Sequence, residues 1–355
     1  MTFRLGITRD LLTSDGSPSF GLGPLELLKQ EQHIDWEFID ETVTEITPDI
    51  MARYDGLHVN SPAVTARSIA RSDCRVRLVS RHGVGYDSVD VAALAAKGIL
   101  TTNTPIAVRR PVAVASLTMI FALAGRLFAK NNLIRKGDLN TRTNKMGLGL
   151  TNRTLGVLGA GGIGLELLAL ARPFGWRMLA CDPFVHADAV SACGASLVDL
   201  DTLLAQSDFL VTTLVLNEKT RHIINRDRLS KMKSSAFLIN MARGPIIDEL
   251  ALIDALNQGV IAGAGLDVFE QEPIQTENPL LKMRQVLLTP HSLCWTDECF
   301  DRLAAFCRRR VGGEQGSLVT IPAEFLFQLF EEATDGARLR LAPPRRLRHA
   351  ARAGP

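Results

Sequence analysis

Apolar and polar positions alternate along the first hundred residues in a way that predicts short strands separated by helical segments. Strands are predicted at 3–8, 36–40, 56–60 and 77–83, with helices or turns at 24–30, 49–54 and 65–72. Alternating strands and helices indicate a parallel sheet that is covered by helices.

The same pattern restarts more strongly at residue 154, where the predicted strands are apolar nearly throughout, as buried parallel strands are. A buried helix at 112–125 joins the two series. We therefore predict an α/β fold with two Rossmann-like or flavodoxin-like parallel-sheet domains and a cleft between them. In the second series, strands are expected at 154–159, 177–182, 209–215, 236–242, 263–269 and 286–290, and helices at 163–175, 200–207 and 248–259.

Composition is ordinary for a globular enzyme, with 46% hydrophobic and 22% charged residues. A formal net charge of +2 gives no reason to expect nucleic acid or a membrane as partner. The start of the chain has no apolar signal-peptide core, and the apolar stretch 112–125 is too short to cross a bilayer. The six cysteines form no CxxC pair, which predicts no metal site and no disulfide framework, and we expect a cytoplasmic protein.

Three glycines, Gly159, Gly161 and Gly164, have the G-x-G-x-x-G spacing of a dinucleotide-binding turn. They follow an apolar strand and open a helix, which is the context that this motif requires. The helix N-terminus then offers N–H groups and a positive dipole end to a diphosphate. Asp182 ends the next predicted strand, where a carboxylate binds ribose hydroxyls and repels a 2′-phosphate. NAD is therefore predicted in preference to NADP.

Charged residues stand at the ends of three later predicted strands: Arg243, Asp267 with Glu272 after it, and His291. Carboxyl ends of parallel strands are where open α/β sheets bind ligands. Arginine suits a carboxylate because it forms bidentate hydrogen bonds, and histidine transfers protons near neutral pH. Taken alone, His291 could instead be a buried core histidine or, with the nearby cysteines, a metal ligand.

Several segments together resemble the D-isomer-specific 2-hydroxyacid dehydrogenase family, including phosphoglycerate and glycerate dehydrogenase-type members. The resemblance extends from about residue 1 to about residue 310. It is carried by "SRHGVGYDSVDVAAL", "TTNTP", "TLGVLGAGGIG", "SDFLVTTLVLNEKTRHIIN", "MKSSAFLINMARGPIIDE", "AGAGLDVFEQEP" and "NPLL…VLLTPH".

This resemblance implies roles at matching positions. His291 would be the general acid in keto-acid reduction, Glu272 would favour its protonated form, and Arg243 would bind the substrate carboxylate and polarise the carbonyl. The backbone N–H groups of Val84 and Gly85 would also receive the carboxylate. The implied NAD site consists of Gly159, Gly161, Gly162, Ile163, Gly164, Asp182, Thr213, Leu214, Met241, Ala242, Asp267 and His291.

The resemblance also implies a domain organisation. Residues 1–104 would form the substrate-binding domain, completed by about 295–335, and residues 105–294 the NAD-binding domain. The arginine-rich residues 336–355 are predicted to be a disordered tail, because they lack apolar periodicity. A homodimer through the NAD-binding domain is expected.

Three positions depart from the family pattern, and one of them is Ser116, where a glutamate is common. Asn152 stands where a glycine is common, and we expect a turn there because asparagine tolerates a positive φ. Val215 replaces a common proline. Polar residues at 58–65 and at Arg81 and His82 favour a short, hydroxylated or sugar-derived acid as substrate, and Arg109 and Arg110 could meet a second anionic group.

Two alternatives to an active dehydrogenase stay open from the sequence. One is an NAD-sensing corepressor-like binding protein, since such relatives share the scaffold, the charged triad and a tryptophan soon after the histidine, here Trp295. The other is an inactive paralogue with an altered C-terminus.

Overall fold

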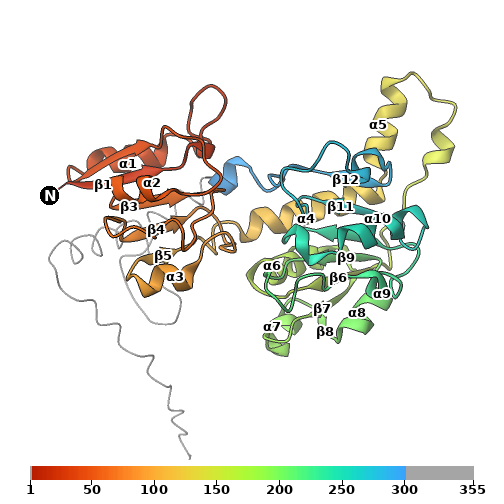
Figure 1. Cartoon of the computed structure of the whole chain (residues 1–355). Helices are drawn as coiled ribbons and strands as arrows, with labels where there is room; N and C mark the ends of the chain where they lie inside the picture. The colour runs from red at the N-terminus through yellow and green to blue at the C-terminus, as the bar shows by residue number, and fades with distance from the viewer. Residues whose placement is uncertain (1, 301–355) are drawn as a thin grey trace, which may run out of the picture. The chain divides into compact units, whose positions relative to one another are not determined.

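A computed structural model describes residues 2–300 of the 355-residue chain. The described residues divide into two compact units, and the division falls between Thr104 and Pro105. We call them unit 1 and unit 2 and describe each by itself (Figure 1). The predicted tail at 336–355, and most of the segment 295–335 that was expected to complete the first domain, lie outside the described residues.

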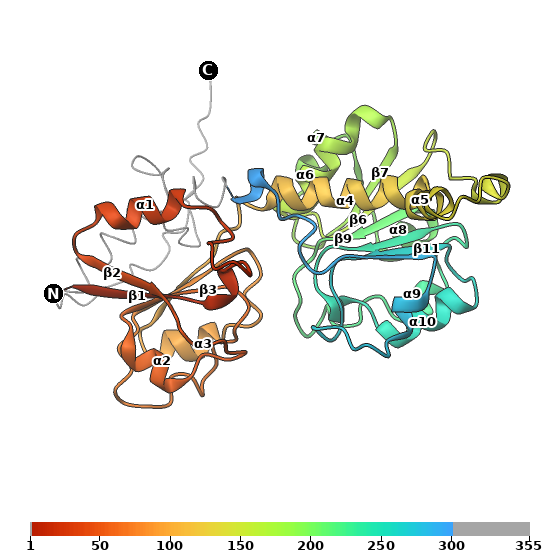
Figure 2. The ribbon, with the colours of Figure 1, turned by 90° about the horizontal axis from the view of Figure 1, so that it is seen from above.

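Unit 1 is built on a five-stranded, parallel sheet in the order β2-β1-β3-β4-β5. In Figure 2, α1 lies on one side of this sheet and α2 and α3 lie on the other. The strands are β1 (Phe3–Ile7), β2 (Ile34–Phe38), β3 (Gly56–Val59), β4 (Leu78–Arg81) and β5 (Leu100–Thr102); the helices are η1 (Arg9–Leu11), α1 (Gly23–Gln30), α2 (Pro48–Arg53) and α3 (Val91–Ala96).

Side-chain caps start two of these helices. The Thr47 hydroxyl accepts a hydrogen bond from the Ile50 N–H at the start of α2, and the Asp90 carboxylate accepts one from the Ala93 N–H at the start of α3. Both helices pack on a core in which Tyr54 is 2% exposed. The caps thus position the apolar faces of α2 and α3 against the sheet.

Unit 2 contains a seven-stranded, parallel sheet in the order β12-β11-β10-β9-β6-β7-β8. Its strands are β6 (Thr154–Leu158), β7 (Arg177–Cys181), β8 (Ser196–Leu197), β9 (Phe209–Thr212), β10 (Phe237–Asn240), β11 (Gly263–Leu266) and β12 (Val286–Leu288). Its helices are α4 (Arg109–Ala124), α5 (Leu127–Arg135), η2 (Arg142–Lys145), α6 (Gly162–Ala171), η3 (Arg172–Phe174), α7 (Ala187–Ala192), α8 (Leu200–Gln206), α9 (Arg226–Leu229), η4 (Gly244–Ile246), α10 (Glu249–Asn257) and η5 (Pro279–Lys282).

Each face of the unit 2 sheet has its own core. Side chains alternate between the faces along a strand, so Leu238 of β10 joins one apolar cluster and Ile239 joins the other. Helices α4 and α6 cover the Ile239 face, where Met119 and Leu167 are fully buried. Burial on both faces explains why the strands of unit 2 are apolar throughout.

The predicted α/β fold with two parallel sheets is confirmed, and the structure adds elements that the pattern did not predict. These are β5, β8, α3, α5, α7 and α9, and the segment 65–72 forms turns. The positive φ expected at Asn152 is confirmed, at 59°.

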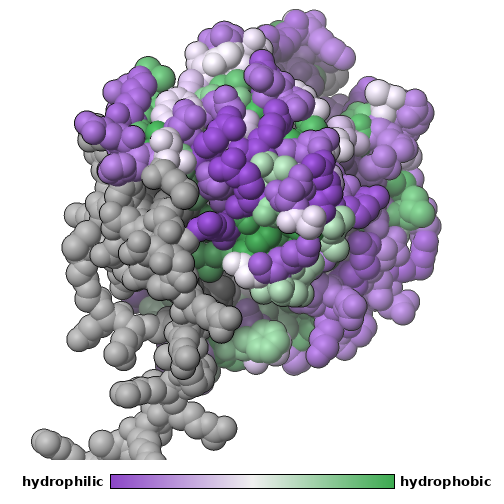
Figure 3. Space-filling model, turned by 60° about the vertical axis from the view of Figure 1, so that its left-hand side comes forward, coloured by the Kyte–Doolittle hydropathy of each residue, from purple (hydrophilic) through white to green (hydrophobic). Residues whose placement is uncertain are grey.

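The face drawn in Figure 3 is mostly hydrophilic, with only small apolar areas. Within residues 2–300, no single helix is long and apolar enough to cross a membrane; only α4 and α5 taken together pass that test, and they are bent by 58°.

Candidate functional site

The glycine-rich turn connects β6 to α6 in unit 2, and space around it explains two of its glycines. Gly159 has φ 96°, and a Cβ there would lie 2.6 Å from the Leu214 nitrogen. A Cβ on Gly164 would lie 2.2 Å from the Gly159 carbonyl oxygen. Both positions therefore require glycine for the close approach of backbone to backbone.

Gly161 is different, because its φ is an ordinary −71° and nothing lies within 4 Å of the place a Cβ would occupy. The protein's own packing does not explain this glycine, whereas a ligand that approaches the backbone would. Gly161 is also the N-cap of α6, so the first N–H groups of the helix, including those of Gly162 and Ile163, point to this open side. The turn thus fits the diphosphate of a dinucleotide.

Asp182 follows β7 and is tied to the same turn. One carboxylate oxygen accepts a hydrogen bond from the Ala160 N–H at 2.8 Å, and the other accepts one from the Phe184 N–H at 2.8 Å. These bonds fix the carboxylate beside the glycine turn and leave each oxygen one further lone pair for a ribose hydroxyl.

Four of the predicted cofactor residues line the neighbouring strand ends. The Thr213 hydroxyl donates to the Gly159 carbonyl at 2.6 Å, and Leu214 forms the wall against which Gly159 packs. Met241 and Ala242, just past β10, are 8% and 7% exposed. The structure therefore brings these residues to the edge of the sheet that carries the glycine turn.

Arg243 lies in the turn between β10 and η4. A Cβ on the next residue, Gly244, would lie 1.8 Å from the Phe269 carbonyl oxygen. Only glycine lets this turn rest on the backbone at Phe269 and Glu270, and that backbone leads directly to Glu272. Close packing of two loops thus brings the Arg243 turn against the loop that carries Glu272.

His291 and Glu272 are in direct contact, with 2.8 Å between Nδ1 of His291 and Oε2 of Glu272. The other oxygen of Glu272 accepts the Phe269 N–H at 2.9 Å. Burial by itself would raise the pKa of Glu272, but the His291 hydrogen bond and charge, the Phe269 N–H and the charge of Arg243 together lower it. The carboxylate is therefore ionised at neutral pH beside the imidazole.

The His291 side chain is 42% exposed, so the interpretation as a buried core histidine is wrong. His291 itself has a left-handed backbone, with φ 54°. Such a conformation is uncommon for a residue with a side chain and persists where the surroundings impose it. Among residues 2–300, no group of three histidine, cysteine, aspartate or glutamate side chains is arranged to hold a metal ion.

Asp267 holds the His291 loop in that conformation. This carboxylate is 3% exposed, and its Oδ1 accepts hydrogen bonds from the Thr289 hydroxyl at 2.6 Å and from the Ser292 and Leu293 N–H groups at 3.2 Å. The bonds bracket His291 on both sides in the sequence.

Asn240 is a positioning residue that sequence reasoning missed. Its side chain, 1% exposed at the end of β10, accepts from the Thr212 hydroxyl and the Ala242 N–H and donates to the Arg243 carbonyl at 2.9 Å. A polar residue that ends an otherwise apolar strand just before "MARG" was the available signal.

In unit 1, Val84 and Gly85 follow β4 in a loop that Gly83 starts with φ 121°. The Val84 carbonyl accepts the Asn103 side-chain N–H at 2.7 Å, and the Gly83 N–H donates to the Thr104 hydroxyl at 3.0 Å. These bonds occupy the Val84 carbonyl and stabilise the loop from the β5 side.

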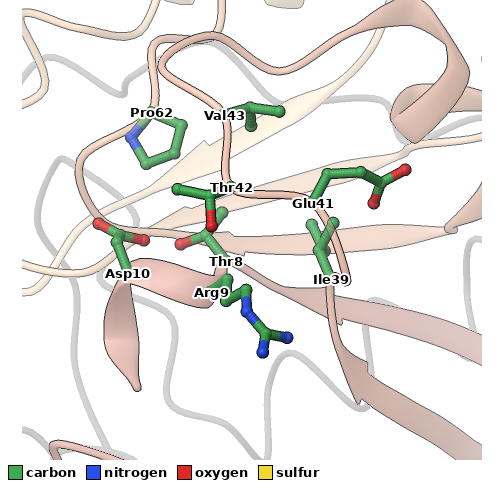
Figure 4. A pocket seen from close by; sticks show the side chains of 8 residues that line it. All are labelled: Thr8, Arg9, Asp10, Ile39, Glu41, Thr42, Val43 and Pro62. Carbon is green, nitrogen blue, oxygen red and sulfur yellow. The ribbon is translucent and has the colours of Figure 1, made fainter. Parts of the chain in front are cut away.

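A small hollow opens at the carboxyl ends of β1 and β2 in unit 1. Figure 4 shows oxygen atoms of Thr8, Asp10 and Thr42 turned towards it. Asp10 also accepts hydrogen bonds from the Asn60 side chain at 2.9 Å and the Ser61 N–H at 2.8 Å. Asp10 and Thr8 thus give this edge of the unit 1 sheet several polar groups, two of which bind the segment at Asn60 and Ser61.

These features together define a dinucleotide-dependent oxidoreductase. They are a parallel sheet with this glycine turn, an acidic residue after the next strand, and a histidine–carboxylate pair at the same edge. The family model for the NAD-binding domain of D-isomer-specific 2-hydroxyacid dehydrogenases matches residues 117–292.

The chain is similar to two curated reductases. It is 38% identical to the glyoxylate reductase of Korarchaeum cryptofilum over 233 residues, 65% of this chain and 70% of that protein. It is 39% identical to glyoxylate/hydroxypyruvate reductase B of Erwinia tasmaniensis over 246 residues, 68% of this chain and 76% of that one. The crystal structure of Aquifex aeolicus D-lactate dehydrogenase complexed with NAD and lactic acid matches with a TM-score of 0.75 at 25% identity, over 94% of this chain and 96% of that chain.

The protein therefore belongs to the D-isomer-specific 2-hydroxyacid dehydrogenase family. It is an NAD-dependent oxidoreductase that transfers a hydride between the nicotinamide and C2 of a 2-hydroxy or 2-keto acid.

Proposed function

We propose that this enzyme reduces short, polar 2-keto acids and that His291, Glu272 and Arg243 are its catalytic residues. NAD supplies the hydride chemistry when it is bound. The single observation that carries the assignment is the 2.8 Å contact between His291 and the ionised Glu272. An ionised carboxylate at this distance orients the imidazole and attracts a positive charge on it.

In the proposed reaction, His291 donates its proton to the carbonyl oxygen as reduction proceeds, and it accepts that proton in the reverse direction. Its Nδ1 contacts Glu272, so Nε2 is the nitrogen that faces the substrate. Arg243 holds the carboxylate and polarises the carbonyl, because a guanidinium forms charge-assisted hydrogen bonds with both. The N–H groups of Val84 and Gly85 are proposed to bind the same carboxylate.

In the cofactor site, the residues from Gly159 to Gly164 are proposed to bind the diphosphate and Asp182 the adenosine ribose. Thr213, Leu214, Met241 and Ala242 would border the dinucleotide, and Asp267 would lie beside the nicotinamide carboxamide. Asp267 already uses one oxygen to fix the His291 loop. Its other oxygen is the one proposed for the carboxamide.

For the substrate, we favour glyoxylate or hydroxypyruvate. Two relatives are named for these compounds, and the polar side chains at Asp10, Asn60 and Ser61 suit a small hydroxylated acid better than a bulky apolar one. Domain assignments follow from these roles: residues 1–104 bind substrate, with about 295–335 completing the domain, and 105–294 bind NAD.

The decisive experiment is NADH oxidation by the purified full chain with glyoxylate, hydroxypyruvate, its phosphate, pyruvate and branched keto acids. We expect turnover with the first two, and loss of at least a hundredfold in kcat for His291→Asn, with NADH still bound. Tight NADH binding without turnover on any acid would instead support the NAD-sensing, corepressor-like alternative.

We also propose a cytoplasmic homodimer formed through the NAD-binding domain. Helix α5 contains no buried residue, and Leu127 and Ile134, seven positions apart on one face, are 58% and 66% exposed. A nine-residue helix without buried contacts needs a partner surface to be stable. Light scattering should give twice the chain mass, and Ile134→Asp should shift it towards the monomer; a monomeric wild type would contradict the proposal.

A further inference from the structure

Arg109, the first residue of α4, rests against the start of the helix that follows the glycine turn. A Cβ on Gly162 would lie 2.4 Å from Nε and 2.8 Å from Cζ of Arg109. Gly162 is the first residue of α6. The space that any other residue would use for its side chain is therefore occupied by a guanidinium group.

The position of this arginine is unfavourable for α4 itself. A cation at a helix N-terminus opposes the helix dipole, and the first turn of α4 contains no acidic residue. Arg110 also places a cation in the first turn of α4, but two ion pairs compensate its charge. Its Nη1 lies 3.0 Å from Oε1 of Glu166, and its Nε lies 3.8 Å from Oε1 of Glu298. The guanidinium of Arg109 forms no hydrogen bond or ion pair with any residue in the part of the chain that the structure describes.

The guanidinium also lies next to a second positive end, the N-terminus of α6. The positive charge of the guanidinium and the positive end of the α6 dipole repel each other at this short distance unless an anion lies near both. Open space beside Gly161 shows where such an anion can approach. In an NAD-dependent enzyme, the anion that fits a glycine turn and a helix N-terminus is the cofactor's diphosphate.

We propose that Arg109 is a diphosphate-binding residue supplied by α4, and that residue 162 is glycine because a side chain there would displace the guanidinium. Arg109 acts on cofactor affinity and not on hydride or proton transfer. This inference rests on the NAD site described above and adds to it a cation from outside the glycine motif.

The test is equilibrium binding of NADH, ADP-ribose and adenosine to the full-length protein and to matched variants. Arg109→Gln should weaken NADH and ADP-ribose binding about tenfold, as expected for one charge-assisted hydrogen bond. It should leave adenosine, which lacks the diphosphate, within about twofold, and Arg109→Lys should recover part of the loss. Arg110→Gln, which removes a paired arginine one residue away, is the control and should change NADH affinity by less than about twofold.

A second variant tests whether the guanidinium needs the space beside Gly162, without changing the charge of Arg109. Gly162→Ala keeps Arg109 but moves its guanidinium, so NADH binding should weaken several-fold. The double variant should then bind NADH no more weakly than Arg109→Gln alone, because both changes remove the same contact.

Three results would overturn the inference: unchanged NADH affinity in Arg109→Gln, an equal loss for adenosine, or fully additive losses in the double variant. If the wild-type protein turns over keto acids while Arg109→Gln binds NADH normally, this inference fails and the proposed function stands. Absence of NADH binding by the wild-type protein would contradict both.

Discussion

At the scale of single residues, Glu272 controls the charge next to His291. Its lowered pKa keeps it ionised through the neutral range, where it stabilises the imidazolium. In Glu272→Gln the shape is retained and the charge is lost. In the proposed reaction, reduction uses protonated His291 and oxidation uses the neutral form. The reductive rate should then fall at a lower pH than in wild type, and the oxidative rate should persist further into acid.

Profiles of kcat/KM against pH in both directions measure this effect, because they report the protonation of the free enzyme. An equal loss of rate at every pH, with unmoved limbs, would mean that Glu272 only orients the imidazole. Gln271→Ala, at an exposed neighbouring position, serves as the control and should leave both profiles in place.

Asp182 is predicted to set the preference for NADH over NADPH. Asp182→Ser removes the charge that repels a 2′-phosphate, so the ratio of kcat/KM for NADH to that for NADPH should fall at least tenfold. The variant also loses the two backbone hydrogen bonds at Ala160 and Phe184. We therefore expect the free energy of unfolding to fall by about 1–3 kcal/mol, and the unfolding temperature to fall with it. A wild-type preference for NADPH would contradict the assignment.

At the scale of elements, the site depends on two loops that touch through their backbones. Gly244→Ala would place a Cβ 1.8 Å from the Phe269 carbonyl oxygen, and no side-chain movement can relieve that clash. The loops must separate, which moves Arg243 away from Glu272. We expect kcat to fall about a hundredfold, since misplacement by about 1 Å has effects of that size, while NADH affinity changes little.

The control for that variant is Gly149→Ala, because Gly149 has open space around it and an ordinary backbone. It should retain wild-type turnover. Similar losses in both variants would show that the effect is a general loss of folding and not a displacement of the Arg243 turn.

The elements that the sequence predicted are those with long apolar patterns. Strands of unit 2 are buried on both faces, so they read as apolar runs. The missed elements are short or lack an apolar signal: β8 has two residues, α9 has four, and α5 buries none of its side chains. The strand predicted at 209–215 ends at Thr212, because Thr213 and Leu214 turn to meet Gly159.

The same distinction applies to the site. Arg243, Glu272 and His291 could be proposed from the sequence because each follows a recognisable strand in a motif. Asn240 was not predicted, and Arg109 was connected only with a second anionic group. Their contacts, with Thr212 and Gly162 respectively, are far away in sequence. Local patterns identify a residue at a strand end, but only the folded chain shows what it touches.

At the scale of the whole molecule, the two units should respond differently to acid, because unit 1 contains a pair of histidines of which His82 is buried and His58 is partly buried. Nε2 of His58 lies 3.1 Å from Nδ1 of His82, and its Nδ1 lies 3.4 Å from the Ser80 hydroxyl. Burial, and then the charge of Arg81, lower the pKa of His58 to about 4 against an opposing effect of Asp10. Burial, His58 and Arg81 also lower the pKa of His82 well below its usual value.

The sign of the effect follows from where the protons bind. Between pH 6.5, the ordinary value, and about 4, the unfolded chain protonates His58 and the folded chain does not. Stability from this group is therefore complete above pH 6.5 and falls as the pH drops to about 4, by about 3 kcal/mol for His58 alone. His82 contributes in the same direction.

Hydrogen exchange measured by mass spectrometry at pH values from 7.5 to 4.5, corrected for the intrinsic exchange rate, can follow the two units separately. Peptides from β3 and β4 should lose protection as the pH falls, while those from β9 and β10 keep theirs. His58→Gln cannot take up the proton, so unit 1 should be less stable at pH 7.5 but should lose less protection on acidification. An unchanged pH dependence in this variant would show that His58 is not the group that links protons to the folding of unit 1.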